Sequence, residues 1–79
     1  MTAKVRARTV IFHSWDSVQG LVEREIVFET LDDLFARCLE IRPGETVDRV
    51  VLDGIDQEGM PRRLTLAFQS ATVSELSLK

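Results

Sequence analysis

His13, Ser14 and Asp16 place a base, a hydroxyl nucleophile and a carboxylate close together in the sequence. Nucleophilic catalysis uses these residue types, but a catalytic triad draws its members from separate parts of a fold so that they converge on one point. Three neighbours at the end of one strand do not converge in that way. We therefore expect His13 to be a surface histidine and the protein not to be an enzyme.

The most acidic loop contains Asp53, Asp56 and Glu58 together with Gly54 and Gly59. Carboxylates on a flexible loop suit a hard cation such as Ca²⁺. However, no Glu stands at the closing position of a twelve-residue calcium loop, and Asp and Gly are ordinary turn residues. We expect a solvated hairpin turn here, with weak adventitious calcium binding as the alternative.

Other cofactor chemistry has little support in this sequence. One cysteine and one histidine make neither a disulfide nor a cysteine- or histidine-based zinc site. The four glycines are scattered, and no glycine-rich phosphate loop follows a strand. Cys38 falls on the apolar face of an expected helix, where a lone cysteine behaves as a small hydrophobe. We expect no metal and no cofactor.

Size and charge exclude further classes of function. The 79 residues, 9.0 kDa in mass, are enough for a single domain over residues 1–79 with one small core. Hydrophobic residues at 44% and charged residues at 29% are typical of a globular domain. A net charge of −3 disfavours binding to duplex nucleic acid or to an anionic membrane. With no signal-like or membrane-spanning apolar run, we expect a cytoplasmic protein without membrane contact.

The first two segments predict a β-hairpin. Residues 4–13 and 21–29 both alternate, with turn-forming residues at 14–20 between them. In the first segment the alternate residues expected on the apolar face of the strand are Val5, Ala7, Thr9 and Ile11. In the second segment they are Val22, Ile26 and Phe28. An antiparallel register that puts the two apolar faces on the same side places Lys4, Arg6 and Arg8 opposite Glu23, Glu25 and Glu29 on the other side. Cross-strand pairs of opposite charge favour this register.

The pattern then changes to a helical period. Apolar residues recur at helical spacing after Thr30, a natural N-cap, and they are Leu31, Leu34, Phe35, Cys38 and Leu39. Asp33 occupies the capping-box position, and Pro43-Gly44 follows the expected helix end. The sequence therefore predicts an amphipathic helix over residues 31–42.

Two further strands follow, over residues 47–55 and 62–70, around a turn near Gly59. We expect Val50 opposite Phe68 and Leu52 opposite Leu66, both pairs facing the core. Residues 71–79 are either a short fifth strand or edge strand, or a frayed tail. The fold class is therefore α+β: two hairpins flanking one helix (ββαββ), with a four-stranded sheet that is β-grasp-like if the first and last strands pair in parallel.

One sheet face remains uncovered in such a fold. If side chains alternate between the two faces as described above, this uncovered face carries five apolar residues, which are Val10, Phe12, Val27, Val51 and Ala67. Trp15, Val18 and Leu21 extend this patch at one edge. An interaction surface explains such a patch, whereas cover by the C-terminal residues and ordinary scatter of apolar side chains are the alternatives. We expect Phe12→Glu to leave the fold intact and to weaken association.

The sequence thus favours a non-catalytic module that binds a protein, most simply a second copy of itself in a homodimer. The bare sheet face or an edge strand would be the interface, with Val10, Phe12, Trp15, Val27 and Val51 as its residues. An acidic regulator or inhibitor of the mobile-element type, which binds another protein, is one alternative. A weak nucleic-acid or metal binder is the other: Phe12 and Trp15 are able to stack on bases, but the acidic ladder beside them repels phosphate.

Overall fold

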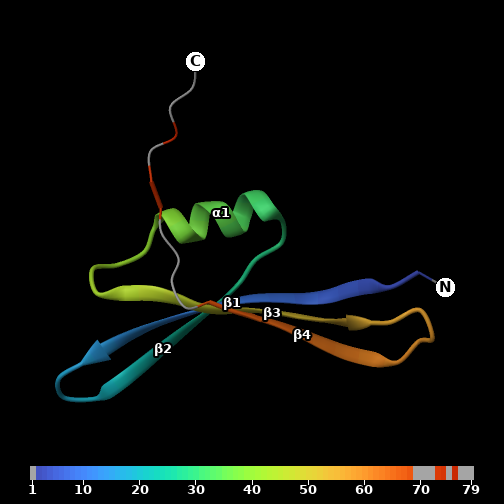
Figure 1. Ribbon diagram of the computed structural model, residues 1–79, viewed down its shortest axis with the longest axis horizontal. Helices are drawn as coiled ribbons and strands as arrows, with labels where there is room; N and C mark the ends of the chain where they lie inside the picture. The colour runs from blue at the N-terminus through green and yellow to red at the C-terminus, as the bar shows by residue number, and fades with distance from the viewer. Residues whose placement is uncertain (1, 69–72, 75, 77–79) are drawn as a thin grey trace.

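The computed structural model describes residues 2–68, 73, 74 and 76, and shows an α+β fold with a four-stranded open sheet and one short helix (Figure 1). In chain order the elements are β1 (Lys4–Asp16), β2 (Gly20–Val27), α1 (Leu31–Leu39), β3 (Glu45–Ile55) and β4 (Pro61–Ala67). The expected strands and helix are all present. The expected fifth strand or tail at 71–79 lies largely outside the described residues.

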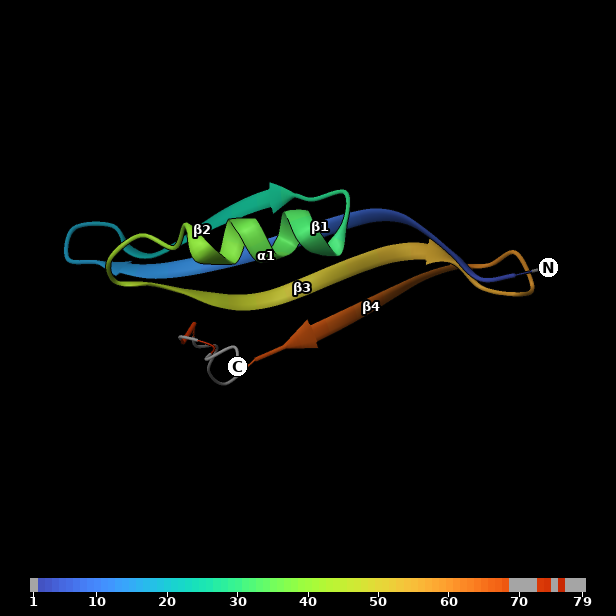
Figure 2. The ribbon, with the colours of Figure 1, turned by 90° about the horizontal axis from the view of Figure 1, so that it is seen from above.

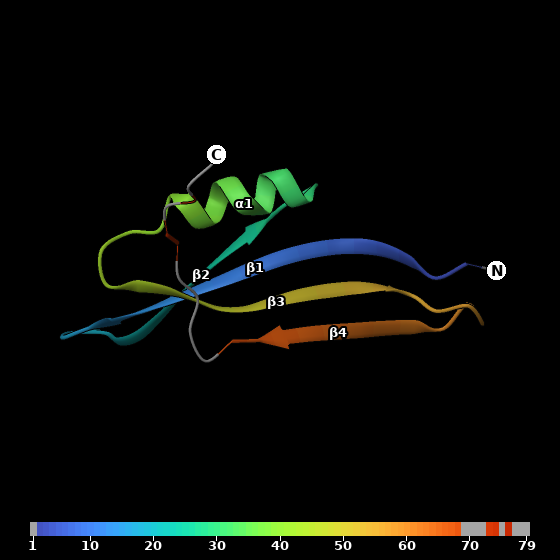
Figure 3. The same cartoon turned by 45° about the horizontal axis from the view of Figure 1, so that its top comes forward.

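The strands lie side by side in the order β2-β1-β3-β4, and every neighbouring pair is antiparallel. A β-grasp-like sheet would instead place β1 next to β4 in parallel, so that comparison does not hold. The helix α1 lies on one face of the sheet toward the β2–β1 side, and β4 lies clear of it (Figures 2 and 3).

Helix α1 begins where the sequence predicts. The Thr30 hydroxyl accepts a hydrogen bond from the Asp33 amide at 3.1 Å, and Asp33 Oδ2 accepts one from the Glu29 amide at 3.1 Å. The first bond satisfies a backbone donor that a helix leaves free at its first turn, and the second fixes the residue before the cap. The helix ends at Leu39, before the predicted Arg42, with Glu40 as its C-cap.

The core lies between α1 and the sheet. Its buried members are Val10, Phe12, Phe28, Val47 and Val50, with Leu34, Cys38 and Ile41 packed against them from the helix side. Val10 and Phe12 are 0% exposed. The prediction that these two residues lie on the bare face is therefore wrong, and with Phe12 in the core we now expect Phe12→Glu to disrupt the fold.

An irregularity in β1 explains the error. The pairing of β1 with β3 shifts by one residue between Val5 and Ala7, and again between Ile11 and Phe12. The first shift has Arg6 as an extra residue of β1 and exchanges the faces to which the odd and even positions of β1 point; the second has Asp48 as an extra residue and does the same in β3. Gly54 permits the close approach of the two strands at the first shift, because a Cβ there would lie 2.3 Å from the Lys4 carbonyl oxygen.

The register of the first hairpin also differs from the prediction. Val10 lies opposite Ile26 and Phe12 opposite Arg24, while Glu23 lies opposite His13. Because β2 ends at the level of Thr9, the expected ladder of Lys4, Arg6 and Arg8 with Glu23, Glu25 and Glu29 is absent from the described strands. Apolar pairing with the core sets this register, and the charged pattern is not strong enough to change it.

The strands of the second hairpin present the predicted side chains to the helix side, but the register of their pairing is displaced by two residues. Val50 lies opposite Leu66 and Leu52 opposite Leu64, whereas the expected partners were Phe68 and Leu66. Since a shift of two preserves parity, the same side chains still face the helix side. The turn carries Gly59 at a φ of 83°, a conformation that favours glycine.

We predict that Phe12→Ala lowers the free energy of unfolding by about 3–5 kcal/mol, because it removes a fully buried aromatic ring from the core. Trp15→Ala is the matched control, since Trp15 lies on the same strand and is 76% exposed. Urea unfolding of both variants gives the two values. A loss at Trp15 as large as that at Phe12 would contradict this assignment of the core.

Candidate protein-binding surface

The residues expected at an interface do not form one surface. Val10 and Phe12 lie in the core, whereas Val27, Val51 and Trp15 belong to the open face that α1 does not cover. Val27 and Trp15 are largely exposed, and Val51 is half-buried. They do not join into an apolar patch, because Thr9 lies between Val27 and Val51 in the same cross-strand row.

The open face is mainly polar. A hollow of about 260 Å³ on it is lined by threonines and charged residues around two apolar side chains, and the lining is Thr9, Ile11, Glu25, Arg49, Val51, Asp53, Arg63 and Thr65. Ile11 is buried although it belongs to this face. The expected bare apolar face is therefore a charged surface.

Ion pairs connect much of this charge. His13 Nδ1 lies 3.0 Å from Asp48 Oδ1, and Arg49 bonds to both Asp48 and Glu23, the latter at 3.4 Å. The hydrogen bonds that Arg49 donates to the Asp48 and Glu23 carboxylates raise the pKa of Arg49. Ser14 follows His13 on β1 and so points to the opposite face, away from this cluster. The structure does not bring His13 and Ser14 together as a base and a nucleophile.

Asp16, the third member of that sequence cluster, has a structural role in the turn after β1. Its Oδ1 accepts hydrogen bonds from the amides of Gln19 and Val18, at 2.9 and 2.7 Å. These two bonds lower the pKa of Asp16. The side chain thus fixes the hairpin turn, as aspartates commonly do.

An exposed apolar surface lies on the other face, between α1 and β4. Helix residues one turn apart form one side of it and alternate residues at the end of β4 form the other. We name this surface the α1–β4 trough, with the members Leu31, Phe35, Leu39, Leu64, Leu66 and Phe68. Their exposed fractions lie between 42% and 79%.

Two hollows occupy the trough. One of about 310 Å³ joins Leu31 to Leu66 and Phe68 over the sheet residues Val50 and Leu52. The second, of about 370 Å³, lies beside Phe35, Leu39 and Cys38, with Val47 and Val73 among its other lining residues. Burial raises the pKa of the Cys38 thiol, which agrees with its expected role as a half-buried apolar residue.

The trough was missed because the apolar helix positions were all expected to be buried. Simple dimensions would have revealed it. Nine helical residues extend roughly 14 Å and are about 10 Å wide, whereas four strands form a sheet roughly 15–20 Å wide and more than 30 Å long. One short helix cannot cover that face, so part of the helix and of β4 is left exposed.

A charged pair closes the core at the opposite end of the helix-covered face. Arg24 makes two hydrogen bonds to Glu45, at 2.6 and 2.9 Å, and its guanidinium carbon lies 4.8 Å from the centre of the Phe12 ring. The Glu45 side chain is only 6% exposed. The bond from Arg24 lowers the pKa of Glu45 and raises that of Arg24. The pair therefore covers Phe12 on the side that α1 leaves open.

We predict that this pair makes stability depend on acid. A carboxyl whose pKa is depressed in the folded state stabilises that state above its unfolded pKa of about 4.5, and the stabilisation is lost as the pH falls through the folded pKa. Urea unfolding between neutral and strongly acidic pH should show a steeper loss for the wild type than for Glu45→Gln. Parallel curves for the two proteins would contradict this role of Glu45.

The described residues hold no group of three or more His, Cys, Asp or Glu side chains placed to bind a metal ion. Within the same part of the chain, α1 spans nine residues and is much too short to cross a bilayer. Comparisons with family models, curated proteins and solved structures find no match to this chain.

Proposed function

We propose that this ββαββ chain is a non-catalytic protein-binding module that associates with a second copy of itself along the β4 edge. The observation that carries the proposal is the exposed α1–β4 trough next to an edge strand. It replaces the open sheet face as the candidate interface, because the open face is charged and the trough is apolar.

The exposed area is large enough for a dimer. If a large apolar side chain carries roughly 200 Å², the six trough residues expose on the order of 600 Å². The largest apolar patch of a typical monomer is about 300–600 Å², so this value is at the upper limit. A standard interface buries about 800 Å² per partner, of which about 60% is apolar. The trough supplies that apolar share.

Charge distinguishes the two edges of the sheet. Edge strand β2 carries Glu23 and Glu25, and pairing β2 with itself would bring carboxylates of two copies close together. On β4 the charged residues are Arg62 and Arg63, and each is neutralised within its own chain. Like-charge repulsion therefore opposes self-pairing at β2 and is weak at β4.

The neutralising partners of β4 come from β3 and the turn after it. Arg63 bonds to Asp53 at 2.6 and 2.9 Å, and Arg62 bonds to Asp56 at 2.9 Å. Both bonds lower the pKa of the carboxyl groups involved. An antiparallel two-fold pairing centred on Thr65 would set Leu64 of one copy opposite Leu66 of the other. The sheet would then extend to eight strands, with the apolar residues of β4 in its interior.

We predict a molar mass near twice 9.0 kDa by light scattering behind a sizing column. Leu66→Glu should shift the mass to that of the monomer, because it introduces a charge at the centre of the proposed contact. Leu64→Glu should act in the same way, and since Leu64 is the more exposed of the two, its replacement disturbs the fold less. Circular dichroism verifies that both variants remain folded.

Val27→Glu is the matched control, because Val27 is an exposed apolar residue on the other edge strand. It should leave the dimer intact. A monomeric wild type over a range of concentrations would refute the proposal. Dissociation by Val27→Glu but not by Leu66→Glu would show that the open face or the β2 edge is the interface.

A further inference from the structure

The first residues of β1 form an edge of the sheet that belongs to neither edge strand. Strand β1 pairs with β3 from Lys4 onward, but its pairing with β2 begins only at Thr9. Along residues 4–8, one side of β1 therefore faces β3 and the other side faces no described strand (Figures 1 and 3). The carbonyl of Arg8 is an exception, since it accepts a bond from the Phe28 amide at 3.0 Å.

This stretch carries three cations that have no ion-pair partner among the described residues, namely Lys4, Arg6 and Arg8. The nearest carboxylates on the β3–β4 hairpin, those of Asp53 and Asp56, are already bound by arginines of β4. Glu29 borders the same hollow as Arg8 but forms no ion pair with it. The stripe therefore remains positive in a protein whose net charge is −3.

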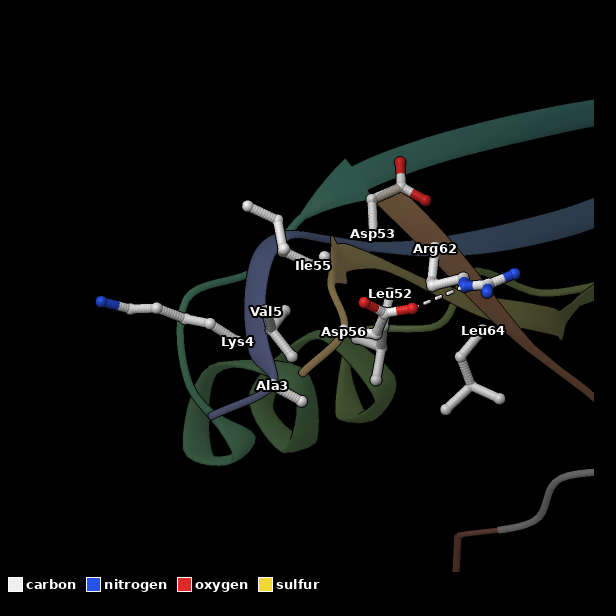
Figure 4. A pocket seen from close by; sticks show the side chains of 10 residues that line it. Ala3, Lys4, Val5, Leu52, Asp53, Ile55, Asp56, Arg62 and Leu64 are labelled. Atoms are coloured by element: carbon white, nitrogen blue, oxygen red, sulfur yellow. Dashed lines mark hydrogen bonds and ion pairs between the residues drawn. The ribbon is translucent and has the colours of Figure 1, made fainter. Parts of the chain in front are cut away.

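Apolar surface lies directly beside the stripe. Val5 borders a hollow of about 260 Å³ together with Leu52 and Leu64, while the Lys4 side chain points away from it (Figure 4). Val5 also borders the neighbouring hollow that contains Phe28. A ligand at this edge would thus meet positive side chains and an apolar depression within a few residues.

We propose that residues 4–8 of β1 bind an extended acidic segment of another protein, which adds a strand to the open edge. Strand addition uses main-chain hydrogen bonds for affinity and alternate side chains for specificity. Acidic residues on one face of the segment would pair with Lys4 and those on its other face with Arg8, because Arg8 borders the same hollow as Val5 whereas Lys4 points the other way (Figure 4). Arg6 lies at the register shift between them, and an apolar residue of the segment would contact Val5. This partner adds to β1, whereas the second copy adds to β4, although Val5 and the trough residue Leu64 border one hollow.

The geometry favours a polypeptide over a nucleic acid. An open strand edge presents amide and carbonyl groups at the spacing of another strand, which a sugar-phosphate backbone does not match. Glu29 borders the same hollow as Arg8, and Glu25 lies on the open sheet face; neither forms an ion pair with a described residue, so both disfavour a polyanion with a charge at every nucleotide.

Fluorescence polarisation tests the proposal with a labelled, end-blocked peptide of three Val-Glu-Glu repeats as the probe, because this repeat places glutamates on both faces of an extended strand. The wild type should bind it, and added salt should weaken the binding. Replacing Lys4, Arg6 and Arg8 together by Gln should reduce the affinity about tenfold or more, since the cross-strand charge pairs with the peptide are lost. These residues lie outside the core, so the variant should fold normally, as circular dichroism will verify.

Arg42→Gln is the matched control, because Arg42 is another cation without an ion pair in the described part of the chain and lies in the loop after α1. It should bind the peptide like the wild type. Equal affinity of the triple variant, or no binding by the wild type, would overturn the proposal. Tighter binding of a dT oligonucleotide of similar length would also overturn it, in favour of a nucleic acid.

A final comparison separates this inference from the proposed homodimer. Leu39→Glu changes the trough at a hollow that contains none of residues 4–8, so it should bind the peptide as well as the wild type does, whatever its oligomeric state. If the triple variant, in the absence of peptide, became monomeric while Leu66→Glu remained dimeric, the acidic strand at this edge would be supplied by a second copy, and the assignment to another protein would be wrong.

Discussion

The structure depends on one mismatch of dimensions: a helix of nine residues must cover a sheet whose longest strand has thirteen. The helix covers the middle of the face toward β2 and β1, where Phe12 and Val10 become fully buried. The rest of that face is covered by side chains outside the helix or is left exposed. At one end, the Arg24–Glu45 pair lies over Phe12. Toward β4, the described residues leave the apolar side chains about half exposed.

This arrangement explains why no helix residue is fully buried. The side of α1 toward the sheet carries Leu34 and Cys38, which pack on the core. Leu31, Phe35 and Leu39 are exposed. Leu31 shares a hollow with Leu66 of β4, and the hollow beside Phe35 and Leu39 is lined by Val47 and Val73. A helix whose apolar positions span such a wide arc normally contacts two neighbours. Here the sheet is one neighbour, and the proposed second copy would supply the apolar surroundings that the chain alone lacks.

Local patterns in the sequence predicted the elements well, because each depends on nearby residues. The Thr30 cap, the turn at Gly59 and the alternation in four segments all correspond to what the structure contains. The faces and registers were less predictable. Val10, Ile11 and Phe12 are all apolar, so either parity is compatible with a buried strand, and the register shifts in β1 and β3 leave no clear signal in the sequence.

The charged stripe shows how such a shift changes a functional interpretation. With the expected register, Lys4, Arg6 and Arg8 would be neutralised by glutamates of β2, and the edge would be closed. In the structure β2 ends at the level of Thr9, so the same cations extend beyond it. Strand length and stagger, which depend on tertiary packing, therefore decide whether the stripe is an internal ladder or an exposed positive edge.

The three exposed strand edges differ in the charge that they present, and this difference argues for distinct roles. The β2 edge is acidic, and it would repel the β2 edge of a second copy. The β4 edge has its arginines neutralised by Asp53 and Asp56, so apolar contact dominates there. The free part of β1 is positive and has no partner in the described chain. Edge strands pair indiscriminately unless something limits the choice of partner. In this small protein the limiting factor is the distribution of ion pairs, which leaves one edge suited to a like copy and another suited to an acidic strand.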